Sequence, residues 1–508
     1  MRRELLLLSA ALFISTASSR TSAAATTTIA APQISGVGAN TTNTTATITW
    51  TTDVASDSRV QFSDTTNPPG SRDPSVSSST LVTSHSIQLT GLLPGTQYFY
   101  NVTSCVSSKN CSSNTANGFK TSPVAGTWKD VSSPDVAPTN ASINNQLRGI
   151  KAISDANVWA VGWANNPQGS FQAAENTLIE HFDGQSWQIV PSPNTRLPQN
   201  ELHAVSGTSA SDVWAVGMAQ DPSTGPQHTL TLHFNGSSWS LVPSPSNDTA
   251  INFLTSVVAL SPTNAYAAGY HAPAPTTANP NPKDETLILH WDGTSWTQIV
   301  SPNPNLANGS NNQLFGLTAI SATDVWAVGF TGDFNNGFAP LTLHFDGTSW
   351  NVIAAVTPST GVTGDYFAAV SAVASNDVWA VGQSRGSSTR HVIEHWDGSQ
   401  WTKFFFTFSP FVNTNFDALY AVSAAASNFV WAVGEIAGTP LIVQWNGTAW
   451  NEVAAPIVNG SATTGNTLHA VSASGINNAF SAGEFFVFTN LDQTAGKFQT
   501  LTETYSVP

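Results

Sequence analysis

One short motif recurs along most of this 508-residue chain and constrains what the chain can fold into. The string VWAVG occurs around Trp159, Trp214, Trp326, Trp379 and Trp431, and the weaker copies AYAAG and AFSAG lie around Tyr266 and Phe480. Twelve positions before each aromatic residue stands a large apolar residue, namely Leu147, Leu202, Leu254, Leu314, Phe367, Leu419 and Leu468. This constant spacing predicts a tight turn between two strands in every copy.

A second motif follows each of the first six copies: HFDGQSW, HFNGSSW, HWDGTSW, HFDGTSW, HWDGSQW and QWNGTAW. Asp-Gly and Asn-Gly tolerate the positive φ of short hairpin turns, so each motif predicts two further strands. Four-stranded units at intervals of 49 to 60 residues are typical of β-propeller blades. Most of the 17 tryptophans occupy three positions of this repeat, where we expect them to pack between sheets.

The seventh copy lacks its fourth strand, because TLTETYS is followed only by the C-terminal residues up to Pro508. The segment GTWKDVSSP, residues 126–134, matches the fourth strand GQSWQIVPSP but precedes the first copy. The simplest solution places Trp128 beside Tyr505 and closes a seven-bladed β-propeller with this N-terminal strand, leaving no open sheet edge. The repeats resemble bacterial kelch-type or tectonin-type propellers, although they have Val-Gly where kelch blades have Gly-Gly.

Residues 26–122 carry another pattern, with short Thr- and Val-rich strands separated by Gly, Pro, Asn and Asp. The segment LTGLLPGTQYFYNV resembles a fibronectin type III domain, with Trp50 in the core, Leu92 at a turn and Tyr98 at the tyrosine-corner position. It is most similar to the domain in front of secreted purple acid phosphatases. The metal-binding motifs of that enzyme do not follow, so the resemblance implies this accessory domain alone.

The N-terminus has the layout of a signal peptide over residues 1–25, with Arg2 and Arg3, an apolar run from residue 5 to 14, and small residues between Ser15 and Ala25. We expect cleavage between Ser19 and Ala25. A retained N-terminal anchor is the alternative. The sequence therefore predicts a secreted or cell-surface protein of bacterial type, with no membrane span in its mature form. Export favours a disulfide between Cys105 and Cys111, against two free thiols.

The fold class predicted from these patterns is all-β, with a fibronectin-like sandwich at 26–122 and a seven-bladed propeller at 124–508. The formal net charge of -15 leaves no basic surplus for nucleic acid. We expect a monomer whose partner is an extracellular carbohydrate or protein.

The long, variable loops after VWAVG and after the fourth strand share one face, which is the candidate functional surface. The residues after the repeated apolar position should ring the mouth of the central channel: Arg148, His203, Thr255, Phe315, Ala368, Tyr420 and His469. The residues after the Val-Gly or Ala-Gly pair should complete a funnel beside them: Trp163, Met218, Tyr270, Phe330, Gln383, Glu435 and Glu484. Such a funnel suits stacking on a sugar or gripping a peptide; the alternative is that these residues merely fill the channel.

Repeated polar residues are expected to be structural. His181, His233, His290, His344 and His395 occupy one equivalent position in separate blades, so they cannot converge on one metal ion. Six of the seven repeat aromatics have an Asp or Asn two residues before them that is expected to be a turn residue: Asn157, Asp212, Asn264, Asp324, Asp377 and Asn478. Asp183, Asp292, Asp346 and Asp397 are expected to belong to the hairpins. We predict no metal site, no cofactor and no catalytic residue from any nucleophile or phosphate-binding motif.

The function predicted from the sequence is a secreted, non-catalytic binding or scaffold protein. One alternative is a secreted carbohydrate-active hydrolase or lyase that uses Arg148, His203, His469, Tyr420 and Glu435. A structural protein of the cell envelope is the other alternative.

Overall fold

The structure is a computed structural model of the whole chain. It describes residues 30–64, 67–92, 96–121, 126–137, 143–165, 174–221, 223, 225–246, 251–277, 279–306, 309–333, 337–356, 362–386, 390–404, 417–456, 465–488 and 496–507. The predicted signal peptide, residues 1–25, lies outside them. The chain divides into two compact units, Met1–Ser122 and Pro123–Pro508. In the described part of the chain every regular element is a strand, and no helix there is long and apolar enough to cross a membrane.

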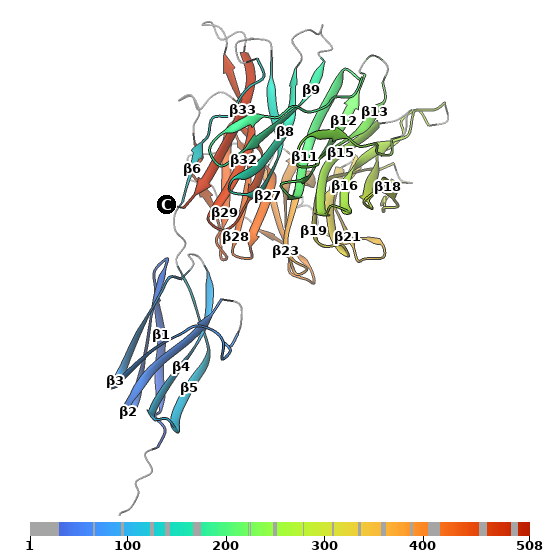
Figure 1. Cartoon of the computed structure of the whole chain (residues 1–508). Coiled ribbons are helices and arrows are strands. Elements are labelled where there is room, and N and C mark those ends of the chain that lie inside the picture. The colour runs from blue at the N-terminus through green and yellow to red at the C-terminus, as the bar shows by residue number, and fades with distance from the viewer. Residues whose placement is uncertain are drawn as a thin grey trace, which may run out of the picture. The chain divides into compact units, whose positions relative to one another are not determined.

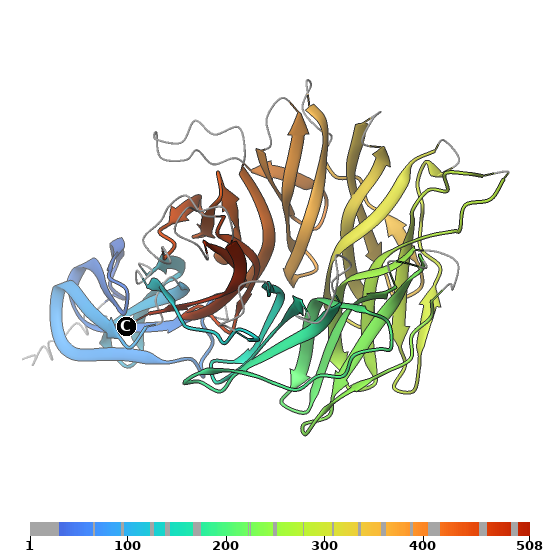
Figure 2. The same cartoon turned by 90° about the horizontal axis from the view of Figure 1, so that it is seen from above.

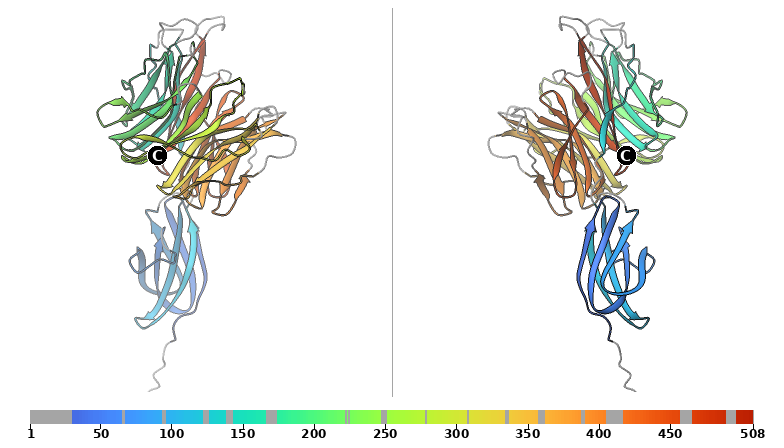
Figure 3. Two further views of the ribbon diagram at one scale, coloured as in Figure 1. Left: turned by 90° about the vertical axis from the view of Figure 1, so that its right-hand side faces the viewer. Right: turned by 90° about the vertical axis from the view of Figure 1, so that its left-hand side faces the viewer.

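The first unit is one antiparallel sheet system (Figure 3, blue). Its strands pair in the order β1-β2-β4-β5, with β3 on β2; the bounds are β1 Ile34–Thr41, β2 Thr45–Ser63, β3 Ser75–Thr90, β4 Gln97–Ser107 and β5 Asn110–Lys120. Buried residues alternate with exposed ones along β2 and β4, which places one face of these strands in a core.

The core of this unit contains the three residues that the sequence singled out. Trp50 is 1% exposed, its indole N–H donates to Ser104 Oγ over 2.9 Å, and Leu92 and Tyr98 are buried in the same cluster. The predicted disulfide between Cys105 and Cys111 is confirmed, and it joins directly paired residues of β4 and β5.

The second unit is a β-propeller built from antiparallel groups of four strands that follow one another along the chain (Figures 1 and 2). In chain order the groups are: β7 Asn145–Ser154, β8 Asn157–Asn165, β9 Glu175–Phe182 and β10 Trp187–Ile189; β11 Gln199–Ser209, β12 Asp212–Gln220, β13 Gln227–Phe234 and β14 Trp239–Leu241; β15 Ile251–Ser261, β16 Asn264–Ala272, β17 Glu285–Trp291 and β18 Trp296–Ile299; β19 Asn311–Ser321, β20 Asp324–Asp333, β21 Gly337–Phe345 and β22 Trp350–Val352; β23 Val362–Ala374, β24 Asp377–Gly386, β25 Arg390–Trp396 and β26 Trp401–Phe404; β27 Asp417–Ala426, β28 Phe429–Ile436, β29 Thr439–Trp445 and β30 Trp450–Val453.

The last group completes itself with a strand from the other end of the unit. It contains β31 Thr467–Ala473, β32 Asn478–Phe488, β33 Gly496–Ser506 and β6 Thr127–Asp130. Tyr505 of β33 pairs with Trp128 of β6, as the sequence predicted, and the Tyr505 hydroxyl accepts a 2.9 Å hydrogen bond from the Gly126 amide. The first strands of successive groups contact one another, and β31 contacts β7. The Ala152 amide of β7 donates to Ser472 Oγ of β31 over 3.0 Å, which ties the last group to the first.

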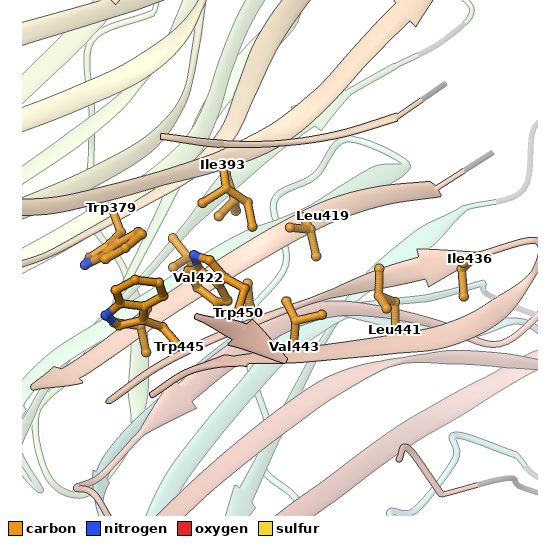
Figure 4. Packing of buried hydrophobic residues seen from close by; sticks show 12 residues of the cluster. Trp379, Ile393, Leu419, Val422, Ile436, Leu441, Val443, Trp445 and Trp450 are labelled. Atoms are coloured by element: carbon orange, nitrogen blue, oxygen red, sulfur yellow. The ribbon is translucent and has the colours of Figure 1, made fainter. Parts of the chain in front are cut away.

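Tryptophans hold neighbouring groups together. The repeat aromatic of one group packs edge-on against the fourth-strand Trp of the next: Trp159–Trp239, Trp214–Trp296, Tyr266–Trp350, Trp326–Trp401, Trp379–Trp450 and Trp431–Trp128, with ring centroids 5.0 to 6.4 Å apart. Figure 4 shows one such interface, where Trp379 meets Trp445 and Trp450 of the following group. The recurring aromatic residues therefore form the contacts between neighbouring four-stranded groups.

The repeated polar residues support the same framework. Each of the five repeat histidines packs against the repeat aromatic of its own group and bonds to the Asp or Asn two residues before it, as His233 does with Asp212 over 2.8 Å. The hairpin Asp side chains accept two backbone N–H bonds each. At Asp292 the hydrogen bond from Thr294 Oγ1, together with the two backbone bonds, lowers the pKa to about 2.

Candidate functional site

The predicted channel residues occupy one unusual backbone position. In every first strand the pairing register skips the residue after the repeated apolar residue; in β11, for example, Leu202 pairs with Gly217 and Ala204 with Val216, so His203 is bulged out. The residues at this bulge are Arg148, His203, Thr255, Phe315, Ala368, Tyr420 and His469. A bulge redirects a side chain away from the two faces of the sheet. We call these residues the bulge ring.

The glycine of VWAVG makes this bulge possible. A Cβ on Gly217 would lie 1.9 Å from the Glu201 carbonyl oxygen, and the equivalent glycines of the other groups meet the same backbone atom at 1.9 to 2.0 Å. The glycine on the second strand therefore allows the close approach of the first strand at which the bulge forms.

All members of the bulge ring line a single cavity of about 210 Å³. The lining continues with the next residue of each first strand, which is Gly, Ala or Ser, and in every group except that of β27 with the apolar residue after it, such as Gly149 and Ile150 or Ala204 and Val205. The structure thus brings together the residues that the sequence placed at the channel mouth, although they lie far apart in the chain.

On one side the cavity is lined by Tyr420 of β27, His469 of β31, Arg148 of β7 and His203 of β11, and we call this side the polar half. Glutamates behind these residues contact them without lining the cavity. Arg148 donates to His469 Nε2 and to Gln146 Oε1 (2.9 Å), and its guanidinium lies 3.6 Å from Glu484. Tyr420 donates to Glu435 over 2.9 Å. Arg148 can only donate, so its bond to His469 Nε2 requires a neutral imidazole that accepts at this nitrogen; Nε2 also lies 3.4 Å from Glu484 Oε1, to which a protonated Nε2 would donate.

Burial tunes the ionisation of the polar half. Desolvation lowers the pKa of His203 to about 3, with the Arg148 charge acting in the same direction, and it also lowers the pKa of His469. Desolvation raises the pKa of Glu175 to about 8, aided by its hydrogen bond with Glu201. The pKa of Tyr420 is raised by burial and by the Glu435 carboxylate. At neutral pH both imidazoles are uncharged and the Tyr420 phenol keeps its proton.

The other side of the cavity, on β15, β19 and β23, is lined by Thr255, Phe315 and Ala368, with further aromatic rings behind them, and we call it the aromatic half. Phe253 stacks on Tyr270 with centroids 5.5 Å apart, and Phe315 meets Tyr366 edge-on at 5.8 Å. Thr255 contributes no free hydroxyl, because its oxygen lies within bonding distance of the Ala268 and Leu314 carbonyls. Ala368 adds only a methyl group. This half offers ring faces and edges rather than charge.

The residues after the Val-Gly pair do not form the open funnel that the sequence predicted. Phe330 is 1% exposed, and Met218, Gln383 and Glu484 are buried as well. They stand opposite the residue that precedes the repeated apolar residue, so their side chains pack behind the bulge ring. Trp163, Tyr270 and Glu435 are half-buried; Trp163 lies under the Arg148 guanidinium at 5.0 Å.

Two sets of residues escaped the sequence analysis. Directly before the repeated apolar residue stand residues that do not line the cavity but in several groups contact those that do: Gln146, Glu201, Phe253, Gln313, Tyr366, Ala418 and Thr467. One position earlier each group has a buried Asn or Asp, such as Asn200, which accepts from the Thr195 amide and donates to the Leu197 carbonyl, both over 2.8 Å. In β23 and β27 this residue is Asp365, bound to Lys403, and Asp417, bound to His391. An in-register alignment of the repeats would have revealed both sets.

Comparison with known proteins supports the division into two units. Residues 32–125 match the family model described as the purple acid phosphatase N-terminal domain. No curated protein matches the chain. Among solved structures, the chain is similar to YCF48 bound to a D1 peptide, with 15% identity, 75% of this chain and 97% of the other covered, and a TM-score of 0.44.

Two further similar structures bind sugars according to their descriptions. One is the fucose-specific lectin from Aleuria aurantia, at 14% identity, 63% and 97% coverage and a TM-score of 0.37. The other is an ulvan lyase from a new family of polysaccharide lyases, at 8% identity, 70% and 93% coverage and a TM-score of 0.44. The chain is thus an all-β protein in which a domain similar to the N-terminal domain of purple acid phosphatases precedes a β-propeller.

Proposed function

We propose that this chain is an exported, non-catalytic recognition protein whose central cavity binds part of an extracellular carbohydrate or peptide. In this proposal residues 1–25 direct export, residues 26–122 form an accessory module, and residues 124–508 form a closed ring of seven blades of kelch-like or tectonin-like type. The protein acts as a monomer and needs no cofactor.

One observation carries the proposal. Seven equivalent bulge positions, built by identical glycines and apolar residues, hold arginine, two histidines, threonine, phenylalanine, alanine and tyrosine around one cavity. A purely structural plug would be served by seven similar side chains. A cavity with a charged side and an aromatic side instead matches ligands that have both hydrogen-bonding groups and an apolar face.

The size of the cavity limits what enters it. Its volume of about 210 Å³ is below the roughly 300 Å³ at which pockets for whole drug-sized ligands begin. The cavity therefore suits one sugar ring or one side chain at the end or at a projecting point of a larger ligand, and the rest of that ligand contacts the loop face.

The test is a binding screen of the purified full chain against glycan and peptide arrays, followed by titration of the hits. Arg148→Ala, His203→Ala and Tyr420→Ala should each weaken binding about tenfold or more, as expected on losing a charge-assisted or buried hydrogen bond. Gln298→Ala, on the exposed outer strand β18, is the control and should leave binding unchanged. Binding that survives all three cavity variants would place the ligand elsewhere.

A carbohydrate-active hydrolase or lyase is the second candidate, because groups with strongly shifted pKa, such as Glu175 and Tyr420, often mark catalytic sites. The Glu175–Glu201 pair does not suit glycoside hydrolysis, since hydrogen-bonded carboxyl groups are closer than the roughly 5 Å or more that both hydrolytic mechanisms require. Turnover of chromogenic glycosides or acidic polysaccharides that is lost in Tyr420→Ala would favour the enzyme.

A further inference from the structure

Arg148 is the one ionised side chain among the residues that line the central cavity. Its guanidinium has five N–H groups, and in the described part of the chain two of them have acceptors, His469 Nε2 and Gln146 Oε1. The contact with Glu484 is 3.6 Å long, beyond hydrogen-bond distance, and 24% of the Arg148 side chain is exposed. The other N–H groups and the positive charge are therefore left for a ligand.

The carboxylates nearest to Arg148 stand behind the bulge ring and do not line the cavity. Glu484 contacts Arg148 from there, and Glu435 accepts hydrogen bonds from Tyr420 and Thr467, both over 2.9 Å. These carboxylates hold the lining side chains in place, and a ligand in the cavity meets the guanidinium first. Because the Coulomb interaction weakens with distance, the attraction of an anion in contact with Arg148 exceeds its repulsion from either carboxylate.

His469 adds a second donor beside Arg148. When its Nε2 accepts from Arg148, the proton of the neutral imidazole is on Nδ1, which can donate to a ligand. Both residues line the cavity, and a carboxylate has two oxygens that can accept from both. This part of the polar half therefore suits a carboxylate.

The two residues on either side of this pair offer acceptors instead. Tyr420 donates its only proton to Glu435, so its oxygen can only accept from a ligand. Glu201 is the acceptor in its hydrogen bond with Glu175, so His203 donates to it from Nε2 over 3.2 Å, which leaves Nδ1 as an acceptor. A ligand that satisfies the whole polar half thus brings hydroxyl donors on both sides of its carboxylate.

The aromatic half presents one ring to the cavity, that of Phe315. Phe330 at 5.8 Å and Tyr366, edge-on at 5.8 Å, hold this ring from behind. The negative face of an aromatic ring attracts the C–H groups of a pyranose. Together with the volume of about 210 Å³, this favours a single sugar ring between the two halves.

Two classes of extracellular ligand carry a projecting carboxylate: peptides, at their C-terminus, and polysaccharides that contain uronic acids. A peptide C-terminus has one backbone N–H next to its carboxylate, whereas a uronate ring has several hydroxyl groups. The cavity has acceptors at both Tyr420 and His203, and it has the Phe315 ring. These features favour the uronate.

We propose that the cavity binds a uronate ring of an acidic polysaccharide, with the carboxylate against Arg148 and the C–H face of the ring against Phe315. This inference rests on the proposed binding function and specifies its ligand class. It implies that the same sugar binds more weakly once its carboxylate is esterified, because the ester cannot pair with the guanidinium.

The experiment titrates the full chain with a galacturonate trimer and with the same trimer after complete methyl esterification. We expect the acid to bind at least about tenfold more tightly than the ester. Arg148→Gln should bring the two affinities within about twofold of each other. Arg148→Lys keeps the charge but not the fork of N–H donors, so it should retain the preference for the acid at lower affinity.

Arg390→Gln is the matched control, because it removes the same charge from the exposed start of β25 and should leave the ratio of the two affinities unchanged. Thermal melts establish that each variant is folded. The comparison of acid with ester on the unaltered chain needs no variant, so it remains decisive if Arg148→Gln fails to fold.

Two outcomes would overturn the uronate inference and leave the proposed function standing. One is binding of the ester as tight as that of the acid, with both lost in Tyr420→Ala. The other is binding of a tripeptide with a free C-terminus, lost on its amidation and in Arg148→Gln, without binding of the galacturonate trimer. Failure of every glycan and peptide to bind would contradict the proposed function itself.

Discussion

The blade interfaces and the bulge ring are built from equally regular backbone, yet they use their side chains in opposite ways. At the interfaces the repeat aromatic and the fourth-strand tryptophan recur in group after group. At the bulge, equivalent positions hold residues as different as Arg148, Phe315 and Ala368. Packing between neighbouring groups constrains the interface positions, so the same residue types recur there. The bulge positions carry no such packing constraint, so their residues can differ from group to group and can serve recognition.

The sharpest test of this contrast is Gly217→Ala. A Cβ there would lie 1.9 Å from the Glu201 carbonyl oxygen, so the bulge of β11 would have to break. We expect a loss of at least about 4 kcal/mol in the free energy of unfolding, measured by denaturant titration of the propeller transition. Gly475→Ala, where an added Cβ meets no atom within 4 Å, is the control and should change stability little. A mild effect at Gly217 would show that the glycine is not required by the bulge.

The next largest effect concerns ring closure. Trp128→Ala should cost about 3 kcal/mol or more, because Trp128 is 6% exposed and packs against Trp431 and Tyr505. Trp239→Ala, at an equivalent interface within contiguous chain, should cost a similar amount. Deletion of residues 127–132 should lower the thermal midpoint of the whole propeller. If Trp128→Ala left the free energy of unfolding unchanged while Trp239→Ala lowered it, the closing strand would contribute no stability.

A smaller effect on the free energy of unfolding is expected from the buried carboxyl group of Glu503. Glu503 is fully buried, and desolvation raises its pKa to about 8, whereas Leu289 and Leu343 stand at this position in other groups. The folded state holds the proton more tightly than the unfolded state. The contribution of Glu503 is therefore complete below the unfolded pKa of about 4.5 and is lost as pH rises through about 8.

Glu503→Leu should remove this pH dependence and raise the stability at pH 8.5 by about 2 kcal/mol, with a much smaller gain at pH 4.5. Thermal melts of both proteins across this pH range measure the difference. Parallel pH profiles for the two proteins would show that Glu503 is not the group that titrates.

The smallest effect on stability should come from the bulge ring. Tyr420→Phe removes one hydrogen bond to Glu435 and should cost no more than about 1 kcal/mol, because the phenol oxygen lies at the cavity rather than in an interface. Its effect on ligand binding should exceed its effect on the melting midpoint. A loss of stability as large as that of Trp128→Ala would remove the distinction between the two regions.

Much of the fold could be predicted from sequence because the spacing of apolar, aromatic and turn residues is nearly the same in every repeat. The spacing from Leu202 to Trp214 specified a hairpin, and the displaced GTWKDVSSP segment specified the pairing of Trp128 with Tyr505. The bulge could not be anticipated, because a one-residue change of register leaves no trace in hydrophobic periodicity. Its only signal was the glycine before Met218 and its equivalents, whose crowding is visible only in three dimensions.

The candidate site was predictable only in part. The bulge ring was found because its members share a position in the repeat, but the halves of the cavity depend on residues such as Glu201 and Phe253 that contact neighbouring groups. Exposure was misjudged for Phe330, because alternation along a strand does not tell which face lies against the adjacent sheet.

The bulge has a consequence for protein engineering. Since each bulged residue lies outside the regular pairing of its strand, its identity is largely uncoupled from the backbone hydrogen bonds that hold the propeller together. Seven codons could be randomised at once in a combinatorial library without disturbing the glycines or the tryptophan interfaces. Selection from such a library would turn this scaffold into a source of new affinity reagents.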